Sequence, residues 1–219
     1  MIRNLRLVVV YGRQLRWRSV LAAVAAGMAL CALTRASGLS SRADDVSGAT
    51  RVSLIVALSF LADGFADPIE HQWIGMSGRV VVRRVLRSAV LLIAGTVAAA
   101  VIVTFCLNFV YRRAEMPWWT LVLEGMCLSG TVIGIGATLA SLRGPGNLGV
   151  FTWVFTAITL GVVHVAASDW WIIFAPTPRS PTWVVSHAHL TILAVTSLLT
   201  GLIASTWQAW RRTSLRPVM

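Results

Sequence analysis

Six long apolar stretches, separated by Arg-rich connectors, occupy most of this chain. Each is close to the roughly 20 residues that a helix needs to cross the core of a bilayer. Charged residues make up 12% of the 219 residues, whereas soluble domains carry about 25%. We therefore expect an all-α integral membrane protein with a single transmembrane domain, 1–219. The expected spans are 19–34, 50–66, 88–110, 118–142, 148–167 and 184–206.

Three segments outside these spans predict further elements. Residues 1–18 place Arg and apolar residues on separate helical faces, which indicates an amphipathic helix on the inner membrane surface. A cleaved signal peptide is the competing interpretation, but no small-residue cleavage site follows the apolar run. The inner connector 67–87 is longer than a hairpin needs. The outer connector 168–183 is apolar and Pro-rich, which is typical of a short re-entrant element.

The distribution of Arg predicts the orientation of the chain. All 19 basic residues are Arg, a composition typical of a GC-rich bacterial genome. With the N-terminus inside, 13 Arg lie on inner segments, and six lie on outer loops: Arg35, Arg42, Arg51, Arg112, Arg113 and Arg179. The positive-inside rule then places both termini in the cytoplasm of a bacterial cell membrane. The net charge of +11 lies beside lipid headgroups, so we expect membrane lipid and not nucleic acid as its partner.

Enzymatic motifs are missing from the sequence. The chain has no Lys, so it lacks the phosphate-binding Lys of a P-loop, and no Ser-His-Asp, HExxH or CxxC pattern occurs. We expect no enzyme activity and no cofactor in this chain. Cys31, Cys106 and Cys127 all fall in apolar stretches, where we expect them to pack as small hydrophobic residues without a disulfide framework.

Ionisable residues in or beside spans are functional candidates by default, because removing them from water is costly. The expected polar translocation cluster, near the outer end of the bundle, consists of Glu124, His164, Asp169 and His189. Two alternatives remain: a Glu124–His hydrogen bond that only packs helices, and a metal or haem site. The metal alternative uses His164, His187, His189 and Glu124. However, His187 and His189 lie about 200° apart on a regular helix, which opposes a shared ion.

Small residues in the fourth span, Gly130, Gly134 and Gly136, allow a close helix contact. We expect this contact to be packing within the chain in preference to a dimer seam.

The layout resembles a known family. A basic surface helix, six spans, an acidic-then-basic inner connector containing DGFADPIEH (63–71) and a short apolar outer insertion are similar to the permease subunits of type-2 ATP-binding-cassette exporters, especially the small half-permeases. The connector lacks that family's acid-x-x-x-Gly-Thr pattern. The resemblance implies an ATP-binding-cassette ATPase subunit that binds ATP and Mg, a second permease copy or paralogue, and export of an amphipathic or hydrophobic cargo.

The inner connector is the expected coupling helix. Asp67 can cap a helix with Pro68 in its first turn, while Trp73 and Ile74 give it an apolar side. The residues expected to contact the ATPase are Asp67, Glu70, His71, Trp73 and Ile74. The alternative is an amphipathic helix that lies on lipid. For the whole chain, the alternative function is a non-transporting membrane anchor that binds haem or copper through its outer histidines.

Overall fold

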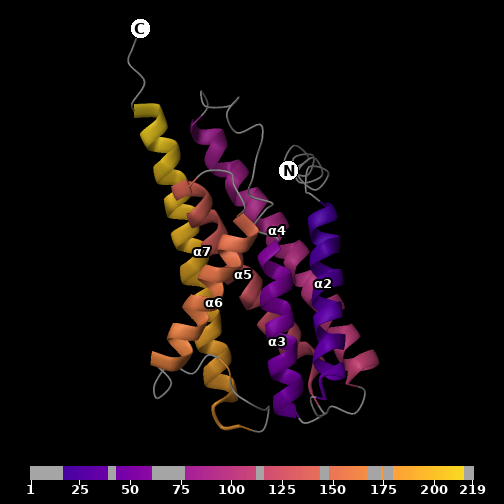
Figure 1. Ribbon diagram of the computed structural model, residues 1–219. Helices are drawn as coiled ribbons and strands as arrows, with labels where there is room; N and C mark the ends of the chain where they lie inside the picture. The colour runs from indigo at the N-terminus through magenta and orange to yellow at the C-terminus, as the bar shows by residue number, and fades with distance from the viewer. Residues whose placement is uncertain are drawn as a thin grey trace.

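The computed structural model describes residues 17–38, 43–60, 77–111, 116–143, 148–166, 174 and 180–214. The regular structure in these ranges is entirely helical, which confirms the all-α class. The α-helices are α2 (Trp17–Ala36), α3 (Ala43–Ser59), α4 (Ser77–Phe105), α5 (Trp118–Arg143), α6 (Leu148–Ala166) and α7 (Trp183–Ser214), and a π-helical turn, η3 (Cys106–Val110), follows α4 (Figure 1).

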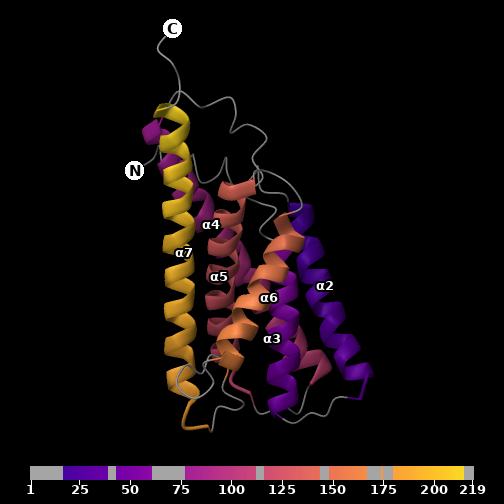
Figure 2. The ribbon, with the colours of Figure 1, turned by 60° about the vertical axis from the view of Figure 1, so that its left-hand side comes forward.

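Successive helices run in opposite directions along one bundle (Figures 1 and 2). The start of α2 and the end of α7 lie at the same end, which we call the terminus end. The helix pairs α2–α3, α4–α5 and α6–α7 are each joined at the opposite end, which we call the hairpin end. As a result, α3, α5 and α7 all begin at the hairpin end, and their early residues lie at similar depth.

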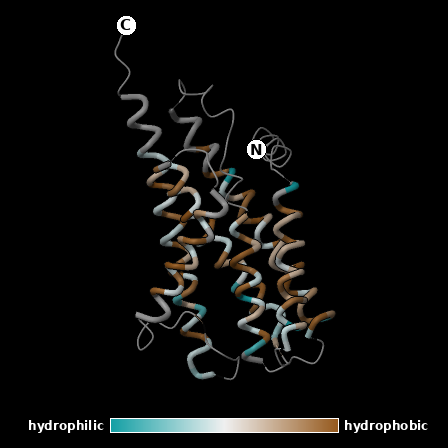
Figure 3. Tube along the Cα trace, in the orientation of Figure 1, coloured by the Kyte–Doolittle hydropathy of each residue, from teal (hydrophilic) through white to brown (hydrophobic). Residues whose placement is uncertain are grey.

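Within the described ranges, three helices are long and apolar enough to cross a membrane: Val85–Val110, Trp118–Leu142 and Trp183–Trp207. A shorter apolar helix covers Val20–Ala36. Hydrophobic residues line most of each helix, and hydrophilic ones lie mainly toward the helix ends (Figure 3). Large apolar side chains such as Leu21, Val97 and Ile203 are exposed on the outside of the bundle, where lipid would cover them. These helices and this apolar outer surface are typical of a membrane protein.

Helix α5 lies at the centre of the bundle and packs most extensively against α7, then against α4, α6 and α3. Glycines make the α5–α7 approach possible. A Cβ at Gly134 would overlap the backbone of Ser197, and a Cβ at Gly201 would come within 2.6 Å of the Gly134 carbonyl oxygen. Gly130 also faces α7, at Ala194 and Leu198. The packing interpretation of Gly130 and Gly134 is thus confirmed, since both meet a helix of the same chain.

The other side of the bundle is held by α2, α3 and α4. Helix α2 buries a stripe at three- and four-residue spacing, Val20, Ala23, Gly27 and Cys31, as a helix with one packed face should. This face meets α3 and α4, because a Cβ at Gly27 would contact Ala57 and Ile102.

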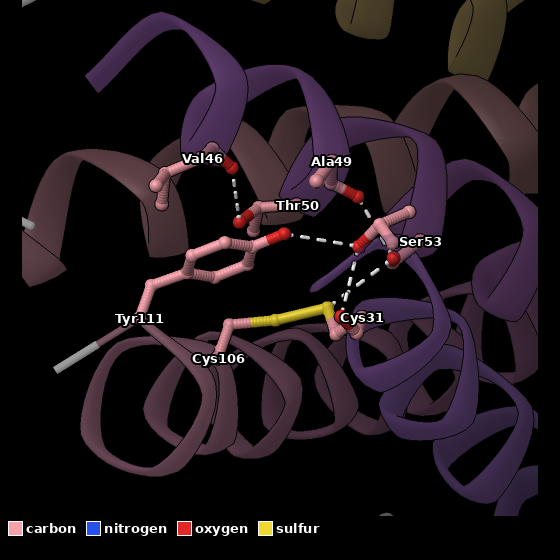
Figure 4. Close-up of a disulfide and its surroundings, with 8 residues drawn as sticks. Cys31, Val46, Ala49, Thr50, Ser53, Cys106 and Tyr111 are labelled. Atoms are coloured by element: carbon pink, nitrogen blue, oxygen red, sulfur yellow. Dashed lines mark hydrogen bonds between the residues drawn. A yellow bond between two sulfur atoms is a disulfide. The ribbon is translucent and has the colours of Figure 1, made fainter. Parts of the chain in front are cut away.

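A disulfide joins Cys31 of α2 to Cys106 of η3, with the Cα atoms 6.2 Å apart (Figure 4). The expectation of three unpaired cysteines was wrong. The two residues are 75 positions apart in sequence, and only the packing of α2 beside α4 brings them together. The Ser53 hydroxyl lies 3.2 Å from Cys31 Sγ and donates to the Ala49 carbonyl. Both half-cystines are fully buried.

The expected bounds of three spans differ from the structure. Helix α3 begins at residue 43 instead of 50, so Asp44 and Asp45 are helical and Arg51 lies about two turns inside the helix instead of at its edge. Acidic residues stabilise the first turn of a helix through its dipole, which explains the earlier start. Helix α4 begins at residue 77 instead of 88, and α7 continues to 214 instead of 206, because Arg-containing segments extend both helices.

The bounds of α2, α5 and α6 agree with expectation within two residues. Several expected elements lie outside the described residues: most of the surface helix 1–18, the acidic part of the inner connector (61–76), and most of the outer re-entrant element (167–173 and 175–179).

Candidate functional site

A buried ion pair connects α3 to α5. Arg51 Nε donates to Glu124 Oε2 at 2.8 Å, and Arg51 Nη2 donates to Glu124 Oε1 at 2.7 Å. This is a bidentate interaction, in which the planar guanidinium donates one hydrogen bond to each oxygen of the carboxylate. The whole-residue exposure is 6% for Arg51 and 1% for Glu124. A charge pair this deep in an apolar bundle binds tightly because little water is present to screen it.

His187 of α7 completes the cluster. Its Nε2 atom lies 3.4 Å from Glu124 Oε1, and its Nδ1 atom lies 2.8 Å from the carbonyl oxygen of Trp183, one helical turn earlier. The Ser186 hydroxyl donates to the same carbonyl at 2.8 Å. The imidazole is thus anchored to its own helix on one side and faces the carboxylate on the other. Hereafter the buried charge cluster means Arg51, Glu124 and His187.

The positions of these residues follow from the direction of their helices. Arg51, Glu124 and His187 lie eight, six and four residues after the starts of α3, α5 and α7. At about 1.5 Å per residue, they sit roughly 6 to 12 Å inside the hairpin end. Three helices that begin at the same end therefore bring three distant polar residues to one depth.

Aromatic rings close the cluster. The Arg51 guanidinium lies 4.9 Å from the ring centroid of Phe174 and 6.0 Å from that of Trp183. The Trp183 and His187 rings have centroids 4.7 Å apart. A guanidinium over an aromatic face gains a cation–π attraction, which is larger when water is excluded. Phe174, which belongs to the outer connector, therefore lies against the cluster.

The Cys127 thiol lies near the cluster on α5. It is the free cysteine of the chain, it is buried, and its Sγ is 3.6 Å from the Thr191 hydroxyl of α7. Buried thiols of this kind are inert packing groups unless a base activates them. We assign Cys127 a packing role between α5 and α7.

The structure brings together only part of the expected polar set. Glu124 is in the cluster, and His189 is half-buried on α7. His164 lies on α6, but its side chain is outside the described part of the structure, as is the whole of Asp169. The ATPase-coupling residues, Asp67, Glu70, His71, Trp73 and Ile74, also lie outside it.

Arg51 was missed as a site residue because the sequence placed it in an outer loop. Its helix begins earlier than expected, so Arg51 lies inside the bundle. One sequence signal could have found it. A carboxylate as deep as Glu124 needs a buried cation to offset its desolvation, and Arg51, among the Arg counted as outer, falls within an expected span, 50–66.

The metal alternative gains no support from the geometry. Among the described residues, no three His, Cys, Asp or Glu side chains are grouped closely enough to hold an ion. Moreover, both carboxylate oxygens of Glu124 already accept hydrogen bonds from Arg51. A cation at Glu124 would have to displace a guanidinium of the same sign.

Two further buried polar groups lie on α6. Thr152 and Thr156 are fully buried, and their hydroxyl oxygens have no hydrogen-bond partner among the described residues. They are one turn apart, so they share a face of α6. Buried hydroxyls are normally paired, and unpaired ones call for an explanation such as a water or a ligand.

Comparisons with models of protein families, with curated proteins and with solved structures found no match to this chain.

Proposed function

We propose that the chain is the permease subunit of an ATP-driven exporter, which forms the path for an amphipathic or hydrophobic cargo together with a separate ATPase and a second permease chain. The observation that carries this proposal is the layout of the bundle. Six helices follow one another in alternating directions, with the start of α2 and the end of α7 at the same end (Figure 1). That layout, with all six helices crossing the membrane, is the one that the sequence resemblance implies.

The disulfide supports the proposed orientation. Cys31 lies near the end of α2, and Cys106 follows the end of α4, so the bridge belongs to the hairpin half of the bundle. Disulfides persist where the compartment is oxidising and are rare where thiols are kept reduced. The hairpin end would then face outward and both termini would lie in the cytoplasm. The excess of Arg on the inner segments independently favours the same orientation.

The inner connector would couple ATP hydrolysis to the bundle. It joins the end of α3 to the start of α4, at the terminus end, which the orientation above assigns to the cytoplasm (Figures 1 and 2). Helix α3 carries Arg51 and ends at Ser59, shortly before the inner connector. A displacement of the connector by the ATPase would therefore act on α3 and on the buried charge cluster.

The interior offers polar contacts to a cargo. The buried charge cluster lies toward the hairpin end, and the unpaired hydroxyls of Thr152 and Thr156 lie on the terminus half of α6. Ionisable groups inside a membrane bundle commonly mark the path of an ion or substrate. We assign these two groups to the proposed path.

Purification tests the proposal directly. We expect a protein with a Walker motif to co-purify with the tagged chain from its own cells. We also expect the purified complex to hydrolyse ATP. The chain alone should hydrolyse none, because it has neither a P-loop nor a Lys. Turnover by a rigorously purified single chain, or a chain that never retains an ATPase, would defeat the proposal.

Substitutions in the inner connector refine the test. Trp73→Ala and Glu70→Arg should reduce the retained ATPase at least several-fold, because aromatic anchors dominate most interfaces, at about 2 kcal/mol or more each. Glu115→Arg is the matched control, since it makes the same charge change outside the inner connector, between Tyr111 and Met116 in the sequence. If the connector lies only on lipid, all three variants will retain the ATPase equally.

A further inference from the structure

Two threonines on the buried face of α6 differ from the threonines of the neighbouring helix. Thr152 and Thr156 are fully buried, and neither hydroxyl has a hydrogen-bond partner among the described residues. A threonine in a helix can donate to the carbonyl one turn earlier, as Thr131 and Thr138 do on α5. Within the described part of α6, Thr152 and Thr156 make no such bond, so both hydroxyls can bond a group from outside the helix.

The face that carries these hydroxyls is turned toward the interior of the bundle. Thr152, Thr156 and Leu160 recur at four-residue spacing and are all buried, and α6 packs against α5 and α3. Thr152 and Thr156 lie four and eight residues after the start of α6, about 6 to 12 Å inside the terminus end (Figures 1 and 2). The buried charge cluster lies toward the hairpin end instead. The two hydroxyls are therefore a separate polar position inside the bundle.

The chemistry of a hydroxyl pair defines the groups that it can bind. Each hydroxyl both donates and accepts hydrogen bonds, and neither carries a charge. The pair therefore suits an uncharged polar group such as an alcohol, an amide or an ester, which needs only hydrogen bonds when it leaves water. A charged group would also need an opposite charge, and the buried charges of Arg51 and Glu124 are already paired with each other.

A separation of α6 from its neighbours would break none of the specific contacts that hold the other helices together. A disulfide joins α2 to η3, an ion pair joins α3 to α5, and glycines bring the backbones of α5 and α7 together. Helix α6 contributes to none of these three contacts, and α5 packs more extensively against α7 than against α6. Opening at α6 would therefore expose the two hydroxyls while the rest of the bundle stays intact.

We propose that Thr152 and Thr156 form a binding site for the uncharged polar group of a cargo whose remainder is apolar. This inference rests on the proposed export function and adds the chemical class of the cargo to it. Cargo that enters from the terminus end reaches these hydroxyls before it reaches the buried charge cluster. Because both side chains are fully buried, binding requires α6 to separate locally from α3 or α5.

Photolabelling of the full chain in lipid nanodiscs tests the site. Four probes share one alkyl chain with a diazirine beside the head, and they differ only in the head: a hydroxyl, a carboxylate, a trimethylammonium or a plain methyl group. Mass spectrometry of the cleaved chain measures how much of each probe is attached to α6. We expect the alcohol to label α6 several-fold more than the other three probes do. Equal labelling by all four, or a preference for a charged head, would overturn the proposal.

Removal of the hydroxyls tests whether they hold the alcohol. Thr152→Val combined with Thr156→Val keeps the shape of both side chains, and we expect it to lower labelling by the alcohol to the level of the methyl probe. The unfolding temperature should stay the same or rise, because no hydrogen bond among the described residues is lost. Undiminished labelling would overturn the proposal. A clear fall in the unfolding temperature would do so too, because it would assign the hydroxyls a structural role.

Two further variants control for side effects of the substitutions. Thr196→Val combined with Thr200→Val removes a pair with the same spacing from the exposed side of α7, and it should leave the labelling of α6 unchanged. Thr152→Ser combined with Thr156→Ser keeps both hydroxyls and should keep the preference for the alcohol. Loss of that preference in either variant would contradict the site.

The outcomes distinguish this site from the export function. The photolabelling needs neither ATP nor a second protein, whereas the export function is tested by co-purification of an ATPase. A chain that retains an ATPase but shows no hydroxyl-dependent labelling keeps the proposed function and loses this site. Hydroxyl-dependent labelling of a chain that never retains an ATPase keeps the site and removes the export function.

Discussion

Arg51 and Glu124 form a buried ion pair, and each charge offsets the desolvation cost of the other inside the bundle. Removing two charges from water costs several kcal/mol per ion, and their attraction offsets that cost only while both are present. The pair also joins α3 to α5 across 73 residues of sequence. Its contribution to stability is therefore a property of the pair and not of either residue.

A double-mutant cycle measures this property. Arg51→Met and Glu124→Leu should each lower the stability of the folded protein by about 3–5 kcal/mol, because each leaves an uncompensated buried charge. The double variant should lose less than either single variant, since two apolar side chains replace the pair. Thermal unfolding in nanodiscs gives the values. Additive losses would mean that the two charges act separately.

Part of the site could be predicted from single residues. Glu124 stands out in the sequence because it is a charge within an apolar span. His187 was named in the metal alternative, and the alternative of a Glu124–His contact left open which histidine is involved. Arg51 was missed because it stands at the edge of the expected span 50–66 and was grouped with the outer-loop Arg, whereas the structure places it eight residues after the start of α3. Which imidazole approaches the carboxylate depends on how α7 is rotated against α5. The glycine spacing in α5 predicts a close helix contact, but it does not specify which helix makes that contact or how the helix is rotated.

At the scale of elements, the close contact between α5 and α7 has a clear steric cause. Gly134 of α5 and Gly201 of α7 each face the other helix, where a side chain would not fit. Gly134→Ala should destabilise the protein by about 1–3 kcal/mol, because its methyl group would meet the backbone of Ser197. This exceeds the gain of up to about 1 kcal/mol that Ala brings to a helix.

Gly161→Ala on α6 is the matched control for this seam. A Cβ there has no neighbour within 4 Å among the described residues, so the change should be neutral or slightly stabilising. Unfolding temperatures of the two variants compare them directly. Equal effects would show that α5 and α7 do not meet at Gly134.

The disulfide between Cys31 and Cys106 can be tested by counting the thiols that react before and after reduction. Protein denatured without reductant should react with a maleimide at one cysteine, Cys127, and at all three after reduction. Cys127→Ser should show none before reduction and two after it. Three reactive thiols in freshly isolated, unreduced protein would show that Cys31 and Cys106 are not joined.

The elements were predictable to different degrees for physical reasons. Helices α2, α5 and α6 end where apolar sequence ends, so their bounds agree with the pattern. Helices α4 and α7 continue through Arg-containing segments, which favour helix but do not belong to an apolar core. The Cys31–Cys106 pairing depends on two helices that are far apart in sequence, and hydrophobic spacing does not specify which helices become neighbours.

At the scale of the whole molecule, our central proposal is a bundle that crosses the membrane six times, with the hairpin end outside and both termini inside. Three helices meet the length and apolarity of a membrane span on their own. Helices α2, α3 and α6 are shorter, but they lie in the same bundle and run between the same two ends (Figures 1 and 2). The proposed ATPase partner, the proposed coupling role of the inner connector and the proposed outward position of the disulfide all depend on this arrangement.

Single-cysteine labelling of intact cells tests that claim most directly. In a Cys127→Ser background, which keeps the disulfide, a membrane-impermeant maleimide should reach cysteines placed at Ser41 and Thr177. Cysteines placed at Ser77 and Ser214 should react only after the cells are permeabilised. Labelling of position 77 or 214 from outside in intact cells would contradict the orientation, and with it the proposed coupling to a cytoplasmic ATPase.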